Sequence, residues 1–174
     1  AYCHMTGLKK NYDPDTDVYH TSWDFMGISC VQCHRPLKPG VRHPQGCLVD
    51  TAPFDRDIHM QTCASCHTRR GELTDGMPPD TLFDDHYVIA LPDREGLYYA
   101  DGQIRDEDYE YTSFLMTRMH LKGVTCFDCH NPHTGKLLLK WEDNSICMQC
   151  HLPPGRLNAT AIDPVEHGHH VAGS

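Results

Sequence analysis

Apolar residues are sparse along this chain and rarely follow a regular period. They make up 39% of the 174 residues, less than is typical of globular domains, and the alternation that predicts half-buried strands is scarce. The clearest helical pattern spans residues 112–121, whose shared face carries Phe114, Leu115, Met119 and, beside them, His120. The pattern therefore predicts short helices joined by long loops, with little or no sheet.

A motif, Cys-x-x-Cys-His, occurs four times within this weak pattern. The copies occupy residues 30–34, 63–67, 126–130 and 147–151, and Ala1-Tyr2-Cys3-His4 needs only one preceding cysteine to complete a fifth. Residues three and four apart share a helix face, so each motif directs both cysteines and the histidine to one side. Proline follows the histidine by two residues in three copies and predicts that each helix ends there: Pro36, Pro132 and Pro153.

This spacing is the attachment signature of c-type haem, in which two thiols bond to the porphyrin and the histidine coordinates the iron. A zinc ribbon and a disulfide framework are the alternatives, and both leave the four histidines unexplained. The predicted haem-binding cysteines are Cys3, Cys30, Cys33, Cys63, Cys66, Cys126, Cys129, Cys147 and Cys150. The predicted proximal ligands are His4, His34, His67, His130 and His151.

Nine further histidines exceed the second-ligand needs of about five irons, which favours bis-histidine coordination. Methionine is the rival ligand, but the seven methionines have no fixed spacing from the motifs and are interpreted as packing residues. His133 and His120 flank the 126–130 motif, and His20 is interpreted as an ordinary residue. The candidate distal ligands are His43, His86, His120, His133, His167 and His170, with His59 in reserve.

Composition and charge limit the partners, fold and cellular location that we expect for this chain. The net charge of −9 excludes a nucleic-acid-binding face, and no apolar run approaches the 18 residues that a membrane span needs. Five haems would leave roughly 35 residues each, so we expect a mainly α, loop-rich chain wrapped around stacked haems as one domain over residues 1–174. Thioether attachment takes place outside the cytoplasmic membrane, which predicts a periplasmic or extracellular protein.

Several segments resemble the multihaem c-type cytochromes of the doubled-CxxCH type, which are often fused to tetratricopeptide repeats. They are residues 1–12, 96–104, 119–133 and 166–170. The resemblance implies either a central part of a longer chain, truncated at both ends, or a natural short relative, and the partial motif at residues 1–4 favours truncation. It also implies that the tyrosine-rich stretch 95–111 is a family feature. From charge alone that stretch is interpreted as a solvated loop. His43 departs from the family, because its interval of nine residues after His34 is longer than usual.

Three functions remain open from the sequence. An electron carrier with a chain of low-spin haems is favoured, and its partners would be redox proteins or neighbouring cytochromes. The alternatives are an oxidoreductase of nitrogen or sulfur compounds with one open haem, and a subunit of a homo-oligomer or extracellular cytochrome filament. Cys47 lies outside every motif and is either a free thiol or a disulfide partner of Cys3, which would reduce the haem count to four.

Overall fold

The computed structural model describes residues 2–40, 55–106, 108–152 and 159–163. Backbone contacts divide the chain into two compact units, Ala1–Thr117 and Arg118–Ser174, and each is described by itself. The expected single domain over residues 1–174 stays a prediction, because this division reflects contacts of the polypeptide alone and a bound haem would add others. Cys47 and three candidate ligands lie outside the described residues: His43, His167 and His170.

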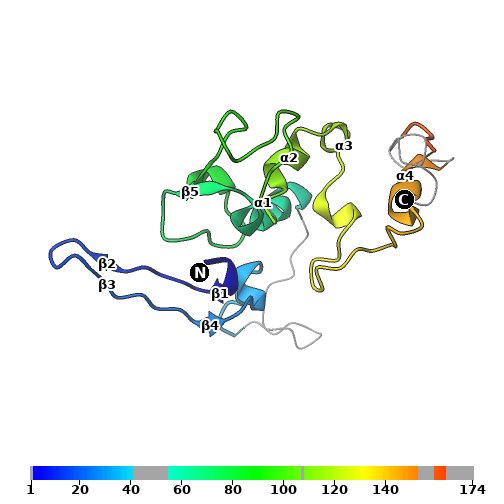
Figure 1. The fold of residues 1–174 in the computed structure, drawn as a ribbon. Helices are drawn as coiled ribbons and strands as arrows, with labels where there is room; N and C mark the ends of the chain where they lie inside the picture. The colour runs from blue at the N-terminus through cyan, green and yellow to red at the C-terminus, as the bar shows by residue number, and fades with distance from the viewer. Residues whose placement is uncertain (1, 41–54, 107, 153–158, 164–174) are drawn as a thin grey trace. The chain divides into compact units, whose positions relative to one another are not determined.

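Short antiparallel strand pairs form the sheet structure of the first unit. The pairs are β1 (Met5–Thr6) with β4 (Phe25–Met26), β2 (Tyr12–Asp13) with β3 (Val18–Tyr19), and β5 (Arg70–Glu72) with β6 (Tyr87–Ile89). Lys9 and Ser22 exchange backbone hydrogen bonds of 2.9 and 3.0 Å, which joins the first two pairs into one long hairpin (Figure 1). Among the described residues the sheet content is therefore small, as the weak alternation predicted.

Most of the helices are one or two turns long. The first unit contains η1 (Tyr2–His4), η2 (Cys30–Gln32), α1 (Arg56–His67), η3 (Phe83–Asp85) and α2 (Tyr111–Leu115). The second contains α3 (Arg118–Leu121), η4 (Cys126–Asp128) and α4 (Ser145–His151). The longest, α1, begins where the Asp55 carboxylate accepts hydrogen bonds from the backbone of Asp57 and Ile58 at 3.0 and 3.1 Å. The expectation of short helices and long connections is confirmed for the described chain.

The helix expected over residues 112–121 is interrupted, so the sequence prediction was wrong in its middle. The backbone N–H and the hydroxyl of Thr117 both donate to the Phe114 carbonyl, at 2.9 and 2.8 Å. A threonine that bonds a nearby carbonyl competes with the regular helix ladder. Two short helices, α2 and α3, result where one continuous helix was expected.

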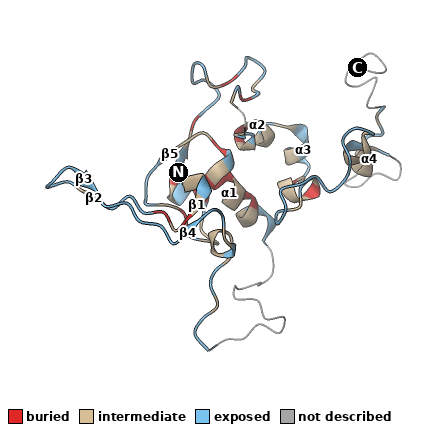
Figure 2. Cartoon of the chain, turned by 60° about the horizontal axis from the view of Figure 1, so that its bottom comes forward, coloured by how far each residue is buried: buried red, intermediate tan, exposed pale blue. Residues whose placement is uncertain are grey.

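A small apolar core lies in the first unit, against α1. Ala64, Met77, Phe83 and Tyr87 form its buried centre, and Tyr87 is only 1% exposed. Figure 2 shows buried positions on α1 and near β1. The aromatic rings of Phe83 and Tyr87 are 5.3 Å apart, a spacing at which such pairs attract. This core fixes α1, and with it the 63–67 motif.

The described part of the tyrosine-rich stretch 95–111 is mostly exposed loop, in agreement with the interpretation from its charge, but two of its apolar side chains are buried. Tyr98 and Ile104 face each other in an isolated β-bridge and are both buried. The Tyr98 hydroxyl donates to the Ala90 carbonyl at 2.9 Å. Most of the described acidic side chains of this stretch are exposed, whereas these two apolar side chains are buried, and net charge alone does not predict that division.

The described part of the second unit has almost no polypeptide core. Among its described residues no apolar side chain is buried, and the buried side chains are those of Thr125 and Asp128. Large apolar residues instead lie exposed, including Leu121, Trp141 and Leu152. No helix within the described residues of either unit is long and apolar enough to span a bilayer.

Candidate functional site

All four complete motifs adopt a helical turn. The 63–67 and 147–151 copies lie inside α1 and α4. In the other two copies the histidine N–H donates to the carbonyl of the first cysteine, from His34 to Cys30 at 2.9 Å and from His130 to Cys126 at 2.8 Å. Each turn therefore carries its first cysteine and its histidine one turn apart, on the same face, as the spacing predicted.

None of the described cysteines forms a disulfide bond. Burial raises the pKa of the Cys33 and Cys129 thiols, and burial together with the nearby Cys3 raises the pKa of Cys66 to about 11. These thiols stay protonated at neutral pH. Because oxidation acts on the thiolate, their raised pKa values protect them from oxidation. In the part of the chain that the structure describes, no three histidine, cysteine or carboxylate groups gather as a ready-made metal site.

The histidines of three motifs have the same second hydrogen bond. The Nδ1 atoms of His67, His130 and His151 lie 2.8, 3.3 and 2.8 Å from backbone carbonyl oxygens. A carbonyl only accepts, so each Nδ1 carries the proton and each Nε2 keeps its lone pair. Histidine ligands of metals usually show this arrangement. The residues therefore fit an iron bound at Nε2.

Two candidate distal ligands have the same tautomer. The Nδ1 atom of His59 lies 2.8 Å from the Asp55 carbonyl. That of His86 lies 2.7 Å from the Thr74 hydroxyl, whose single proton is donated to Gly76 at 2.9 Å. In both rings Nδ1 must donate, which leaves Nε2 available to a metal.

The other described ligand candidates occupy separate positions. His120 lies in α3, partly buried, and His133 lies exposed in the turn that follows His130. His4 ends η1 and is exposed. Their predicted roles as iron ligands stay predictions.

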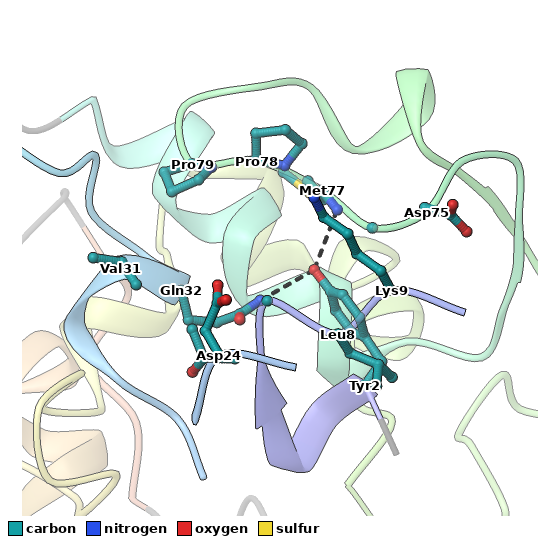
Figure 3. A pocket seen from close by; sticks show the side chains of 13 residues that line it. Tyr2, Leu8, Lys9, Asp24, Val31, Gln32, Asp75, Met77, Pro78 and Pro79 are labelled. Carbon is teal, nitrogen blue, oxygen red and sulfur yellow. Dashed lines mark hydrogen bonds between the residues drawn. The ribbon is translucent and has the colours of Figure 1, made fainter. Parts of the chain in front are cut away.

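The N-terminal turn η1 contacts two other motifs of the first unit. The Cys3 thiol lies 3.9 Å from the Cys66 carbonyl oxygen. The Tyr2 hydroxyl accepts hydrogen bonds from the Gln32 side chain at 3.1 Å and from the Met77 backbone at 3.2 Å (Figure 3). The cavity beside them holds about 200 Å³, below the about 300–1,000 Å³ of ordinary ligand pockets. Side chains of η1 thus contact both other motifs, and the hollow beside Tyr2 and Gln32 is too small for a macrocycle.

The last two motifs also contact each other. The Gln149 side chain, inside the 147–151 motif, donates to the Asp128 carbonyl at 2.9 Å. Burial is the largest cause of the raised pKa of Cys129, followed by the charge of Asp128. The nearby Cys150 and Cys147 make smaller electrostatic contributions. The Asp128 carboxylate in turn accepts from the Thr125 N–H at 2.8 Å and caps the η4 turn. These two attachment sites are therefore neighbours.

An apolar hollow lies along residues 137–145, between these two motifs in the sequence. It holds about 610 Å³, and its apolar lining side chains are Leu137, Leu138, Leu139 and Trp141. Each of the four is at least 40% exposed, and the Leu138 N–H donates to the Cys129 carbonyl at 2.8 Å. Exposed apolar side chains of this extent mark a surface that another group covers. Their position beside Cys129 fits a porphyrin.

Several supporting residues were missed from the sequence. The carbonyls that orient the motif histidines belong to Asp108, Gly135 and Thr160, and a backbone carbonyl leaves no sequence signal. Arg70 was also missed: its guanidinium lies 3.6 Å above the Tyr87 ring, and its Nε donates to the Ser65 carbonyl at 2.6 Å, inside the 63–67 motif. The available signal was the pair Arg69-Arg70, which begins two residues after His67.

Comparison with known proteins gives one family match and several relatives. The family described as "Doubled CXXCH motif" matches residues 120–154. Proteins named cytochrome c-552 from Bacteroides fragilis and Bacteroides thetaiotaomicron are each 23% identical over 76% of this chain, and the chain spans about a third (34%) of their length. Testin from Sus scrofa is 24% identical over 71% of this chain and 28% of its own. No solved structure matches.

Proposed function

We propose that this chain conducts electrons along a series of covalently bound haems, because its family match and its relatives support a multihaem c-type cytochrome with a doubled CXXCH motif. Haem c supplies reversible one-electron exchange at its iron. The polypeptide supplies thiols, axial imidazoles and spacing. We further propose about five haems in this stretch, most of them with two histidine ligands.

The observation that carries this proposal is the contact between attachment sites. In the first unit the Cys3 thiol lies 3.9 Å from the Cys66 carbonyl, and in the second Gln149 bonds to Asp128 at 2.9 Å. Cofactors attached at such neighbouring points lie close together, as a relay requires. A single open catalytic site would not need neighbouring attachment sites.

The motif histidines would hold the iron in a fixed orientation. A proton on Nδ1, donated to a backbone carbonyl, prevents ring rotation and increases the basicity of Nε2. The apolar side chains of residues 137–141 would cover the porphyrin and exclude water. The structure and solvation of a site that is fixed and excludes water change little when the iron is reduced. A small structural change on reduction favours rapid electron transfer.

We also propose a location outside the cytoplasmic membrane, because thioether attachment takes place there. The expected partners are redox proteins or neighbouring cytochromes of opposite or complementary surface charge. Fractionation of cells that carry the haem-loaded chain tests the location, and recovery in the cytoplasm would contradict it.

The haem count of the full chain tests the proposal most directly. We expect a pyridine haemochrome assay to give about five haems per chain, since there are four complete motifs and one partial motif. The variant Cys63→Ala/Cys66→Ala should lose one haem, whereas the matched control Cys47→Ala should lose none. A wild-type chain that emerges from a haem-maturing host without haem would overturn the proposal.

Electron paramagnetic resonance of the oxidised protein tests the coordination. Bis-histidine haems give low-spin ferric signals only. A stoichiometric high-spin signal, with carbon monoxide binding to one reduced haem, would instead favour an enzyme with an open iron.

A further inference from the structure

The side-chain rings of His34, which follows η2, and His59, which lies on α1, are close together in the first unit. Their ring centres are 6.3 Å apart and their planes are inclined by 55°. His34 is the predicted proximal ligand of the 30–34 motif. His59 lies on α1, four residues before Cys63. From the sequence, His59 is predicted only as a reserve distal ligand.

This separation is close to that of two imidazoles on opposite sides of one metal. Metal–imidazole bonds are about 2.0–2.1 Å long, and a ring centre lies about 1 Å beyond its bonding nitrogen. Two such rings in line therefore have centres about 6 Å apart, close to the 6.3 Å observed. Packed aromatic rings have centres about 4.5–7 Å apart, so an experiment must separate ligation from packing.

His59 has the protonation state that a ligand needs. Its Nδ1 donates to the Asp55 carbonyl at 2.8 Å, within the first turn of α1. Asp55 itself is fixed as the N-cap of that helix by bonds from Asp57 and Ile58. The ring is therefore oriented by a rigid helix end, and Nε2 keeps its lone pair.

We propose that His34 and His59 are the two axial ligands of the haem attached through Cys30 and Cys33. This inference rests on the proposed function and adds the identity of one ligand pair. It gives α1 two roles, since the helix also carries the proximal His67 of the next haem. Eight residues of α-helix separate His59 from His67, about 12 Å at 1.5 Å per residue. One rigid helix would then set the spacing of two consecutive haems.

The test compares variants of the full, haem-loaded chain by electron paramagnetic resonance and carbon monoxide binding. His59→Ala should convert one haem per chain from low-spin to high-spin, and that haem should bind carbon monoxide when reduced. Added imidazole should restore the low-spin signal. His59→Met should keep all haems low-spin, add the charge-transfer absorption of methionine-ligated ferric haem and raise one reduction potential. His20→Ala is the matched control and should change none of these.

The outcomes separate this inference from the proposed function. If His59→Ala keeps the wild-type haem count and every haem stays low-spin, the ligand pair is wrong while the electron relay stands. A loss of stability without a spectral change would mean that the two rings only pack together, which also overturns the pair. If the wild-type chain holds no haem, the proposed function itself fails.

Discussion

The two compact units carry the same motif but bury different amounts of apolar surface. Nine apolar side chains are buried among the described residues, and all of them belong to residues 1–117. The described residues 118–152 and 159–163 contribute Thr125 and Asp128 as their only buried side chains. The first unit therefore has a polypeptide core of its own, and the second lacks one in its described part.

This difference indicates that the units depend on their cofactors to different extents. Burial of apolar surface is the dominant favourable term in folding, and a chain that buries none must obtain that term elsewhere. A porphyrin over Leu137, Leu138 and Trp141 would supply it to the second unit. In the first unit a porphyrin would add to a core that already packs around Tyr87.

Removal of the haems should produce the largest difference in amide exchange between the two units. The variant Cys126→Ala/Cys129→Ala/Cys147→Ala/Cys150→Ala should leave residues 118–152 with amide exchange near that of an unfolded chain. The matched variant Cys30→Ala/Cys33→Ala/Cys63→Ala/Cys66→Ala should keep α1 protected, because its core remains. We expect at least about tenfold slower exchange in α1 than in the second unit, by mass spectrometry. Equal exchange in both would refute the comparison.

Truncation of the central core residue should have the next largest effect. Tyr87→Ala removes a side chain that is 1% exposed, and such a cavity costs about 3–5 kcal/mol of unfolding free energy. Urea denaturation of the haem-loaded chain measures it. The neighbouring Val88→Ala, at a side chain 54% exposed, is the control and should stay within about 0.5 kcal/mol. Similar losses for both variants would mean that the haems, and not this core, stabilise the first unit.

A smaller loss is expected at the buried polar anchor of the second unit. Asp128→Ala leaves the Thr125 N–H, now bonded at 2.8 Å, without its acceptor, at a cost of about 1–3 kcal/mol. Urea denaturation and amide exchange over residues 125–130 should both detect it. The exposed Glu142→Ala serves as the control and should change stability by less than about 0.5 kcal/mol. An unchanged Asp128→Ala variant would mean that haem attachment alone holds the η4 turn.

Local features of the site could be predicted from the sequence, and features that depend on distant residues could not. The motif helices follow from an i, i+4 spacing, which the 30–34 and 126–130 copies confirm by a backbone bond within each. The break at Thr117 depends on a side-chain hydrogen bond that competes with a periodic apolar pattern. The closeness of the His59 and His34 rings depends on how α1 packs near a segment 25 residues earlier. The periodicity of the sequence does not predict such a contact.

The hydrogen bonds that orient the motif histidines also imply an order of assembly. His130 and His151 bond to carbonyls five and nine residues later, whereas His67 bonds to one 41 residues later. Contacts between residues distant in sequence form more slowly, because a longer loop must close first. During synthesis from the N-terminus, the 63–67 motif therefore emerges well before the residue that fixes its ring. Its cysteines are available to the attachment machinery while its histidine is still free to turn.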